Sequence, residues 1–140
     1  MGIDIISTVC ADAREPDDSL NGRFDLVIGD VPCSGFGVIG KKPEIRYKDK
    51  ESLGGLPRIQ GDILRNLAGF VKPGGTLLYS TCTVFEEENE AVVMDFLNER
   101  EDFQLVPFSV FGRECDGMYT FWPNIDGTDG FFAAKLLRKQ

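Results

Sequence analysis

Two cysteines of this sequence stand in short polar turns, which are places for chemistry rather than for packing. Cys33 lies in the segment Pro-Cys-Ser-Gly of residues 32–35, and Cys82 lies in Ser-Thr-Cys-Thr of residues 80–83. A thiolate is a nucleophile that can form a covalent bond to a substrate. Asp30, three residues before Cys33, adds a carboxylate that can hold or move a proton. Cys82, Cys33 and Asp30 are therefore the candidate catalytic residues.

The other cysteines and the composition indicate a reduced protein without a structural metal. Cys10 and Cys115 are interpreted as small apolar residues. The four cysteines lie far apart and the sequence has no histidine, so neither a zinc site nor a disulfide framework is predicted. No apolar run is long enough for a membrane span, and the first residues lack the pattern of a signal peptide. We expect a cytoplasmic protein of one domain.

The net charge of −8 argues against broad electrostatic adhesion to nucleic acid, which requires lysine and arginine to displace phosphate counterions. Residues 41–50 are the exception, with five basic and two acidic residues. Because this segment follows Cys33 closely, Lys41, Lys42 and Arg46 are candidate contacts for nucleic acid. A solvated surface loop is the alternative interpretation.

Apolar runs predict the strands that position the two polar turns. Residues 5–10 are rich in β-branched side chains and predict a first strand. Residues 24–29 form a continuous apolar run of the kind found in parallel strands, and residues 76–80 predict the next strand. Ligands of such sheets bind at the carboxyl ends of the strands. Both cysteines are therefore expected at that edge.

Helical spacing predicts two helices that pack on the sheet. Residues 59–71 place apolar side chains on one face, and Lys-Pro-Gly-Gly at 72–75 ends that helix. Residues 83–86 have the Thr-x-x-Glu form of a capping box, and apolar side chains within 91–97 predict a helix after it. The acidic run 86–88 is interpreted as complementing the dipole of that helix.

Residues 103–107 and 130–137 predict the last two strands. No helix is predicted between them, so they are expected to form an antiparallel pair. Strands that alternate with helices indicate an α/β fold whose sheet is mostly parallel, apart from this final pair.

The motifs around the two turns resemble the NOL/NOP/Sun family of RNA cytosine-C5 methyltransferases, and within it the bacterial Sun (Fmu, RsmB) type that acts on small-subunit ribosomal RNA. The resemblance covers nearly the whole chain. The segments that carry it are Asp-Val-Pro-Cys-Ser-Gly-Phe-Gly at 30–37, Gln-Gly-Asp-Ile-Leu at 60–64, Lys-Pro-Gly-Gly at 72–75, Tyr-Ser-Thr-Cys-Thr at 79–83, Glu-Glu-Asn-Glu at 87–90 and Asp-Gly-Phe-Phe-Ala-Ala-Lys at 129–135.

This resemblance implies a Rossmann-like fold that uses S-adenosylmethionine to methylate RNA. It implies that Cys82 is the nucleophile that adds to C6 of cytosine, and that Cys33 assists product release. The residues alone leave the reverse assignment open, since Cys33 could equally be the nucleophile. Asp12, Asp30 and Pro32 are implied contacts of the cofactor, with Asp12 at the adenine. Capping of the following turn is the alternative role of Asp12.

The same family places its Gly-rich cofactor loop and an acidic ribose-binding residue upstream of the first residue of this chain. Gly-x-Gly-x-x-Gly at 35–40 resembles such a loop only superficially, because no clear helix follows it. Residues 1–140 are therefore expected to be a partial catalytic domain that lacks this loop and the first two strands, and the isolated chain is expected to be inactive. A non-catalytic interaction module with this fold is the alternative.

Two further expectations concern the sheet edge and competing chemistry. Without its neighbours, the strand around Val27 would expose an apolar edge, so we expect either self-association or direct pairing with the strand at 5–10. Methylation of DNA or of amino groups is disfavoured, because residues 30–33 lack the aromatic side chain that the amino-group enzymes place after Pro-Pro.

Overall fold

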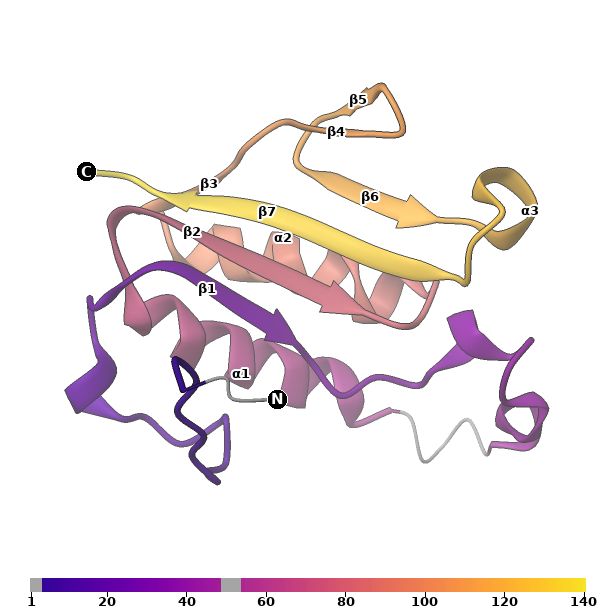
Figure 1. Ribbon diagram of the computed structural model, residues 1–140, viewed down its shortest axis with the longest axis horizontal. Coiled ribbons are helices and arrows are strands. Elements are labelled where there is room, and N and C mark those ends of the chain that lie inside the picture. Colours follow the sequence, from indigo (N-terminus) through magenta and orange to yellow (C-terminus); the bar gives the residue numbers. More distant parts are fainter. Residues whose placement is uncertain (1–3, 49–53) are drawn as a thin grey trace.

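The computed structural model describes residues 4–48 and 54–140, and these residues build one five-stranded mixed sheet. β1 and β2 are parallel, whereas β7 is antiparallel to β2, β3 and β6. Figure 1 shows that β1 and β2 end on the same side of the molecule, where β7 begins. The strands in spatial order are β1 (Phe24–Asp30), β2 (Val71–Thr81), β7 (Phe131–Arg138) and β3 (Phe103–Leu105), with β6 (Met118–Phe121) beside β3 on the same edge of β7.

The expected α/β class is confirmed, and so is the antiparallel pairing of the strands near 103 and 131. The described part of the sheet nevertheless holds one parallel pairing and three antiparallel ones. The parallel pair is the one that carries the two cysteine turns.

Two helices, α1 (Leu56–Phe70) and α2 (Glu90–Glu99), cover one face of the sheet (Figure 1). α1 confirms the helix predicted near residues 59–71, and Pro57 lies in its first turn, where the missing N–H breaks no helical hydrogen bond. β2 follows directly at Val71, so residues 72–75 form an irregularity within the strand rather than a separate turn. Among the described residues, no helix is long and apolar enough to cross a membrane.

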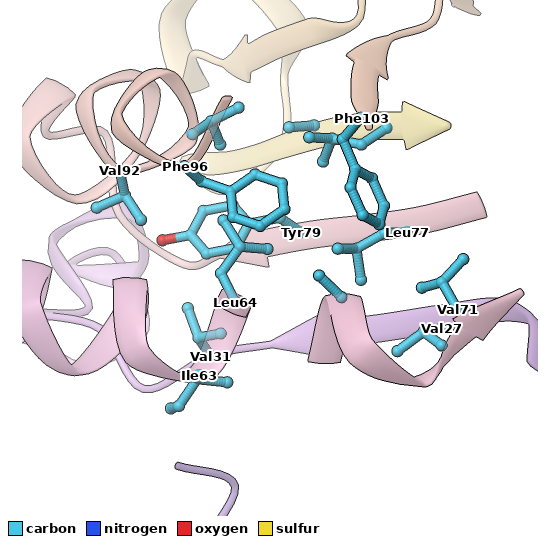
Figure 2. Close-up of a cluster of buried hydrophobic side chains, with 14 of the residues drawn as sticks. Val27, Val31, Ile63, Leu64, Val71, Leu77, Tyr79, Val92, Phe96 and Phe103 are labelled. Atoms are coloured by element: carbon cyan, nitrogen blue, oxygen red, sulfur yellow. The ribbon is translucent and has the colours of Figure 1, made fainter. Parts of the chain in front are cut away.

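The hydrophobic core lies between the sheet and these two helices (Figure 2). Alternate residues of β2 point into it: Leu77 and Tyr79 are fully buried, whereas Leu78 between them faces the opposite side. The Tyr79 ring meets Phe132 of β7 edge to face, with ring centroids 6.1 Å apart. Leu64 of α1 is also fully buried beneath the sheet.

The opposite face of the sheet is open. Leu26 and Ile28 of β1 are 51% and 62% exposed, and β1 is a terminal strand of the sheet. An apolar hollow of about 510 Å³ lies on this face, lined by Leu26, Thr76, Leu78, Phe108, Ala133 and Lys135.

The strand predicted at residues 5–10 is wrong, and its expected pairing with β1 is wrong too. These residues form an exposed coil, in which Ile5 is 89% exposed and Val9 is 85% exposed. β propensity alone does not hold a strand, because its backbone groups need a neighbouring strand to bind and its side chains need a surface to cover. Self-association through β1 stays a prediction.

The segment between β3 and β7 contains elements that the sequence did not indicate. They are the hairpin of β4 (Phe108–Val110) and β5 (Arg113–Cys115), then β6, then the short α3 (Pro123–Asp126). Each spans only three or four residues, which is too short for a hydrophobic period to be recognised.

Replacement of Leu64 by alanine tests the core. We expect Leu64→Ala to lower the free energy of unfolding by about 2–5 kcal/mol, because it leaves a cavity at a fully buried site. Met94→Ala, at a position of α2 that is 45% exposed, should change the same quantity by about 0.5 kcal/mol or less. Urea denaturation measures both, and equal losses would contradict the assigned core.

Candidate functional site

The two cysteine thiols meet at the carboxyl ends of β1 and β2. Cys33 Sγ lies 2.8 Å from Cys82 Sγ, and the backbone N–H of Cys82 donates to Cys33 Sγ at 3.1 Å. Both side chains are half-buried. The structure therefore brings together the two turns that the strand pattern placed at one edge.

The surroundings of Cys33 favour its protonated form. Burial, and after it the hydrogen bond with Cys82, raises the pKa of the Cys33 thiol to about 12. Cys33 therefore keeps its proton at neutral pH and can donate it to Cys82 Sγ. A sulfur that accepts a hydrogen bond is better able to carry negative charge. The two sulfurs are therefore not equivalent, because Cys33 can serve as the donor and Cys82 as the acceptor of this contact.

Asp30 is the last residue of β1 and lies at the same edge of the sheet. It stands opposite Ser80 in the parallel register, and the Ser80 hydroxyl donates to Asp30 Oδ1 at 2.9 Å. The Asp30 side chain is otherwise exposed to solvent. Its carboxylate is therefore available to a ligand that sits over the strand ends.

Side chains from separate elements hold the backbone on both sides of Cys33. The carbonyl of Pro32 accepts from Gln60 Nε2 of α1 at 3.0 Å. The N–H of Ser34 donates to Glu88 Oε2 at 2.9 Å, and the carbonyl of Ser34 accepts from Lys48 Nζ at 2.7 Å. The turn around Cys33 is consequently fixed by three partners that are distant in sequence.

The turn around Cys82 is held by Asn89, which is fully buried. Asn89 Nδ2 donates to the carbonyl of Thr83 at 3.1 Å, and Asn89 Oδ1 accepts from the Thr81 hydroxyl. The Thr83 hydroxyl accepts from the Ser34 hydroxyl at 2.9 Å, which links the two cysteine turns directly.

The capping box predicted at residues 83–86 is therefore wrong. Thr83 serves the cysteine site, and α2 begins only at Glu90, after a short 3-10 turn at Glu86–Glu88. The three glutamates of the acidic run differ in environment: Glu86 and Glu87 are exposed, whereas Glu88 is buried.

Sequence reasoning did not select Gln60, Glu88, Asn89, Ser34, Thr83 or Lys48 as site residues. The available signal was their position, since Gln60 and Glu88 lie in segments that carry the family resemblance.

Two glycines join the cysteine turns to the start of β7. The N–H of Gly37 donates to the carbonyl of Cys82 at 3.0 Å, and the N–H of Gly130 donates to the carbonyl of Gly37 at 2.8 Å. A Cβ atom at Gly37 would stand 1.9 Å from the carbonyl oxygen of Gly130. This close approach of two backbones requires a glycine.

Asp12 lies in the coil before β1 and makes the turn contacts that were its alternative role. Its Oδ1 accepts from the Arg14 backbone N–H at 2.9 Å and from Arg14 Nε at 3.0 Å. These hydrogen bonds lower the pKa of the Asp12 carboxyl to about 2. The contact with a cofactor adenine stays a prediction.

The basic segment forms an arm beyond the carboxyl ends of β1 and β2 (Figure 1). The arm contains two 3-10 helices: η2 (Phe36–Val38) precedes the basic segment, and η3 (Pro43–Tyr47) lies within it. Lys42 and Arg46 are exposed, whereas Lys41 forms an ion pair with Asp129 before β7. Residues 49 and 50 of the predicted basic segment lie outside the described residues.

Comparison with known proteins finds one consistent set of relatives. A family model described as "16S rRNA methyltransferase RsmB/F" matches residues 1–137. The protein of Bacillus subtilis (strain 168) named "Probable ribosomal RNA small subunit methyltransferase B" is 40% identical, over 99% of this chain and 33% of its own length.

Solved structures are similar over the same length. The crystal structure of PH0851 aligns with a TM-score of 0.88 and 36% identity, covering 99% of this chain and 32% of that protein. The structure of NSun6 from Pyrococcus horikoshii with SFG aligns with a TM-score of 0.76 and 30% identity, covering 99% and 36%. This chain thus spans about a third of the length of these relatives.

Substitution of Gly37 tests the backbone contact that joins the cysteine turns to β7. We expect Gly37→Ala to lower the free energy of unfolding by about 1–3 kcal/mol, because the added methyl group overlaps the Gly130 carbonyl. Gly40→Ala is the matched control, because a Cβ at Gly40 meets no atom within 4 Å. Thermal unfolding compares the two, and a neutral Gly37→Ala would show that the two backbones do not approach this closely.

Proposed function

This chain belongs to the 16S rRNA methyltransferase RsmB/F family, and we propose that the two cysteines at its strand ends catalyse methylation of carbon 5 of a cytosine in RNA. The observation that carries the proposal is the contact of the two sulfurs at 2.8 Å, in a site where Cys33 keeps its proton. Addition of a nucleophile to the substrate requires one thiol. A reaction that forms a bond to sulfur and later breaks it can use a second thiol to assist the second step.

Covalent addition makes C5 of cytosine reactive. The Cys82 thiolate adds to C6, and the electron pair of the C5–C6 double bond becomes available at C5 for attack on a methyl group. S-adenosylmethionine, when bound, would supply that methyl group from its sulfonium and would leave as the neutral thioether. A general base then removes the proton from C5. The electron pair of that C–H bond forms the C5–C6 double bond again, and the bond between Cys82 Sγ and C6 breaks to release the Cys82 thiolate.

We assign Cys33 to this release step and Cys82 to the addition. Hydrogen bonding from the protonated Cys33 favours the thiolate at Cys82 before addition, and it favours the departure of the same thiolate afterwards. The exposed Asp30 carboxylate, at the same edge of the sheet as the thiols, can accept a hydrogen bond from the exocyclic amine of cytosine, and from N3 once N3 carries a proton in the adduct. Such a contact stabilises the adduct.

Use of S-adenosylmethionine is supported by the family and by one structural relative. SFG, with which NSun6 was determined, is an analogue of S-adenosylmethionine. We propose that Asp30 and Pro32 face the methyl end of this cofactor and that Asp12 contacts its adenine. The open strand ends of β1 and β2 are where ligands of α/β sheets bind.

The names of the relatives support ribosomal RNA of the small subunit as the substrate. We propose that the protein acts in the cytoplasm. We propose that Lys41, Lys42 and Arg46 bind RNA phosphates, since the arm that carries them lies beside the cysteine site. Lys41 would have to leave Asp129 to do so, so the other two are the stronger candidates.

Alanine substitutions distinguish the roles of the two cysteines. In a polypeptide of family length that carries these residues, Cys82→Ala should reduce methyl transfer by about 10⁴-fold or more, as loss of a covalent nucleophile does. Cys33→Ala should instead accumulate a covalent RNA adduct, because release is blocked. Denaturing electrophoresis with labelled RNA detects the adduct, and an adduct in Cys82→Ala would reverse the two roles.

Removal of two arm charges tests RNA binding. We expect Lys42→Ala combined with Arg46→Ala to weaken RNA affinity and to reduce the slope of log K against log salt by roughly 0.7–0.9 for each phosphate that is no longer neutralised. Lys72→Ala with Lys139→Ala is the matched control, because it removes the same charge at the opposite end of the sheet. Filter binding at several salt concentrations measures both pairs, and equal effects would exclude a specific role for the arm.

A further inference from the structure

Glu88 is a buried carboxylate that the proposed reaction does not use. It is 4% exposed, although its neighbours Glu86 and Glu87 in the same 3-10 turn are exposed. A charged group loses its hydration on burial, and this cost is offset only where hydrogen bonds replace the water. The partners of Glu88 therefore indicate why the chain retains a carboxylate there.

Those partners either belong to the two peptide units that flank Cys33 or form a hydrogen bond with them. Glu88 Oε2 accepts from the Ser34 N–H at 2.9 Å and from Gln60 Nε2 at 2.9 Å. The same Gln60 Nε2 donates to the Pro32 carbonyl at 3.0 Å. Glu88 and Gln60 thus bridge the residue before Cys33 and the residue after it.

Glu88 and Gln60 are themselves held firmly. The backbone carbonyl of Glu88 accepts from the buried Tyr79 hydroxyl at 2.6 Å, which ties the turn to β2. Gln60 is fully buried in α1, and its Oε1 has no hydrogen-bond partner among the described residues. The reversed amide would direct that oxygen at the carboxylate of Glu88 and the carbonyl of Pro32. The observed orientation therefore gives up one hydrogen bond to keep the two that hold the Cys33 turn.

We propose that Glu88, acting through Gln60 and the Ser34 amide, is a positioning residue that sets Cys33 Sγ against Cys82 Sγ. With both flanking peptide units fixed, little but rotation about χ1 remains to place the sulfur. Precise placement of reacting groups is a major source of rate acceleration. The proposal rests on the proposed function only in that it treats the cysteine pair as the reacting groups.

Site-resolved alkylation of the thiols tests this role without RNA or a methyl donor. In the 140-residue chain, Glu88→Ala should raise the rate at which iodoacetamide labels Cys33 by about tenfold, the order expected for loss of a charge-assisted hydrogen bond. The pKa of the Cys33 thiol, obtained from the pH dependence of its labelling rate, should also fall from about 12 toward the ordinary thiol value, because the freed turn exposes the sulfur.

Two variants and one internal thiol provide the controls. Glu88→Gln should label like the unmodified chain, because the amide oxygen can accept both hydrogen bonds, and Glu87→Ala changes an exposed neighbour and should have no effect. Buried Cys115 lies in β5, remote from this network, and its labelling rate reports on the whole fold. Gln60→Leu removes the other half of the bridge and should act in the same direction as Glu88→Ala.

Each outcome of the labelling experiment supports or overturns the proposal. Selective labelling of Cys33 in Glu88→Ala, restored in Glu88→Gln, supports it. An unchanged Cys33, a parallel rise at Cys115, or a Glu88→Gln variant that behaves like Glu88→Ala overturns it, as does failure of both Glu88→Ala and Gln60→Leu to fold. Because no methyl transfer is measured, such a failure leaves the proposed reaction standing, and loss of that reaction leaves the positioning role standing.

Discussion

The parallel pairing of β1 with β2 is the constraint on which the cysteine site depends. It sets Asp30 opposite Ser80, so that the segments after β1 and β2 leave the sheet side by side and at the same level. Cys33 and Cys82 follow within three residues of that pair, and their sulfurs have little freedom to be elsewhere. A slip of one residue in the register would turn the alternate side chains of β2 over and would remove Leu77 and Tyr79 from the core. Core packing and the geometry of the site are consequently specified together.

Around this pair, the site is built from polar side chains that are buried. Glu88, Gln60, Asn89 and Thr83 lie at 4% exposure or less. Such groups cost free energy unless their hydrogen bonds are satisfied, and they then make alternative packings of the turns unfavourable. These buried contacts therefore hold the backbone of both cysteine turns, while Asp30 and Pro32 beside them are exposed.

The sequence predicted the parts of the fold that depend on long hydrophobic patterns. β1, β2, α1 and β7 each carry enough apolar residues to show a period, and the polar turns that follow the first two strands marked the site. The strand at residues 5–10 failed because propensity does not supply a pairing partner. Glu88 was missed because three identical residues in a row cannot show which one turns inward. That choice is made by tertiary partners, Ser34 and Gln60, which lie far away in the chain.

The contact of Gly37 with Gly130 also bears on the order in which the molecule is assembled. β7 is the last strand of the sequence, yet it lies inside the sheet, between β2 on one side and β3 and β6 on the other. Contacts between distant positions form late, because the chain entropy lost in closing a long loop must be overcome first. Gly37 and Gly130 lie farther apart in the sequence than the paired residues of β1 and β2, so their contact closes the longer loop. We therefore expect this contact to form after β1 has paired with β2, and the cysteine site to be complete only when the start of β7 has joined the sheet.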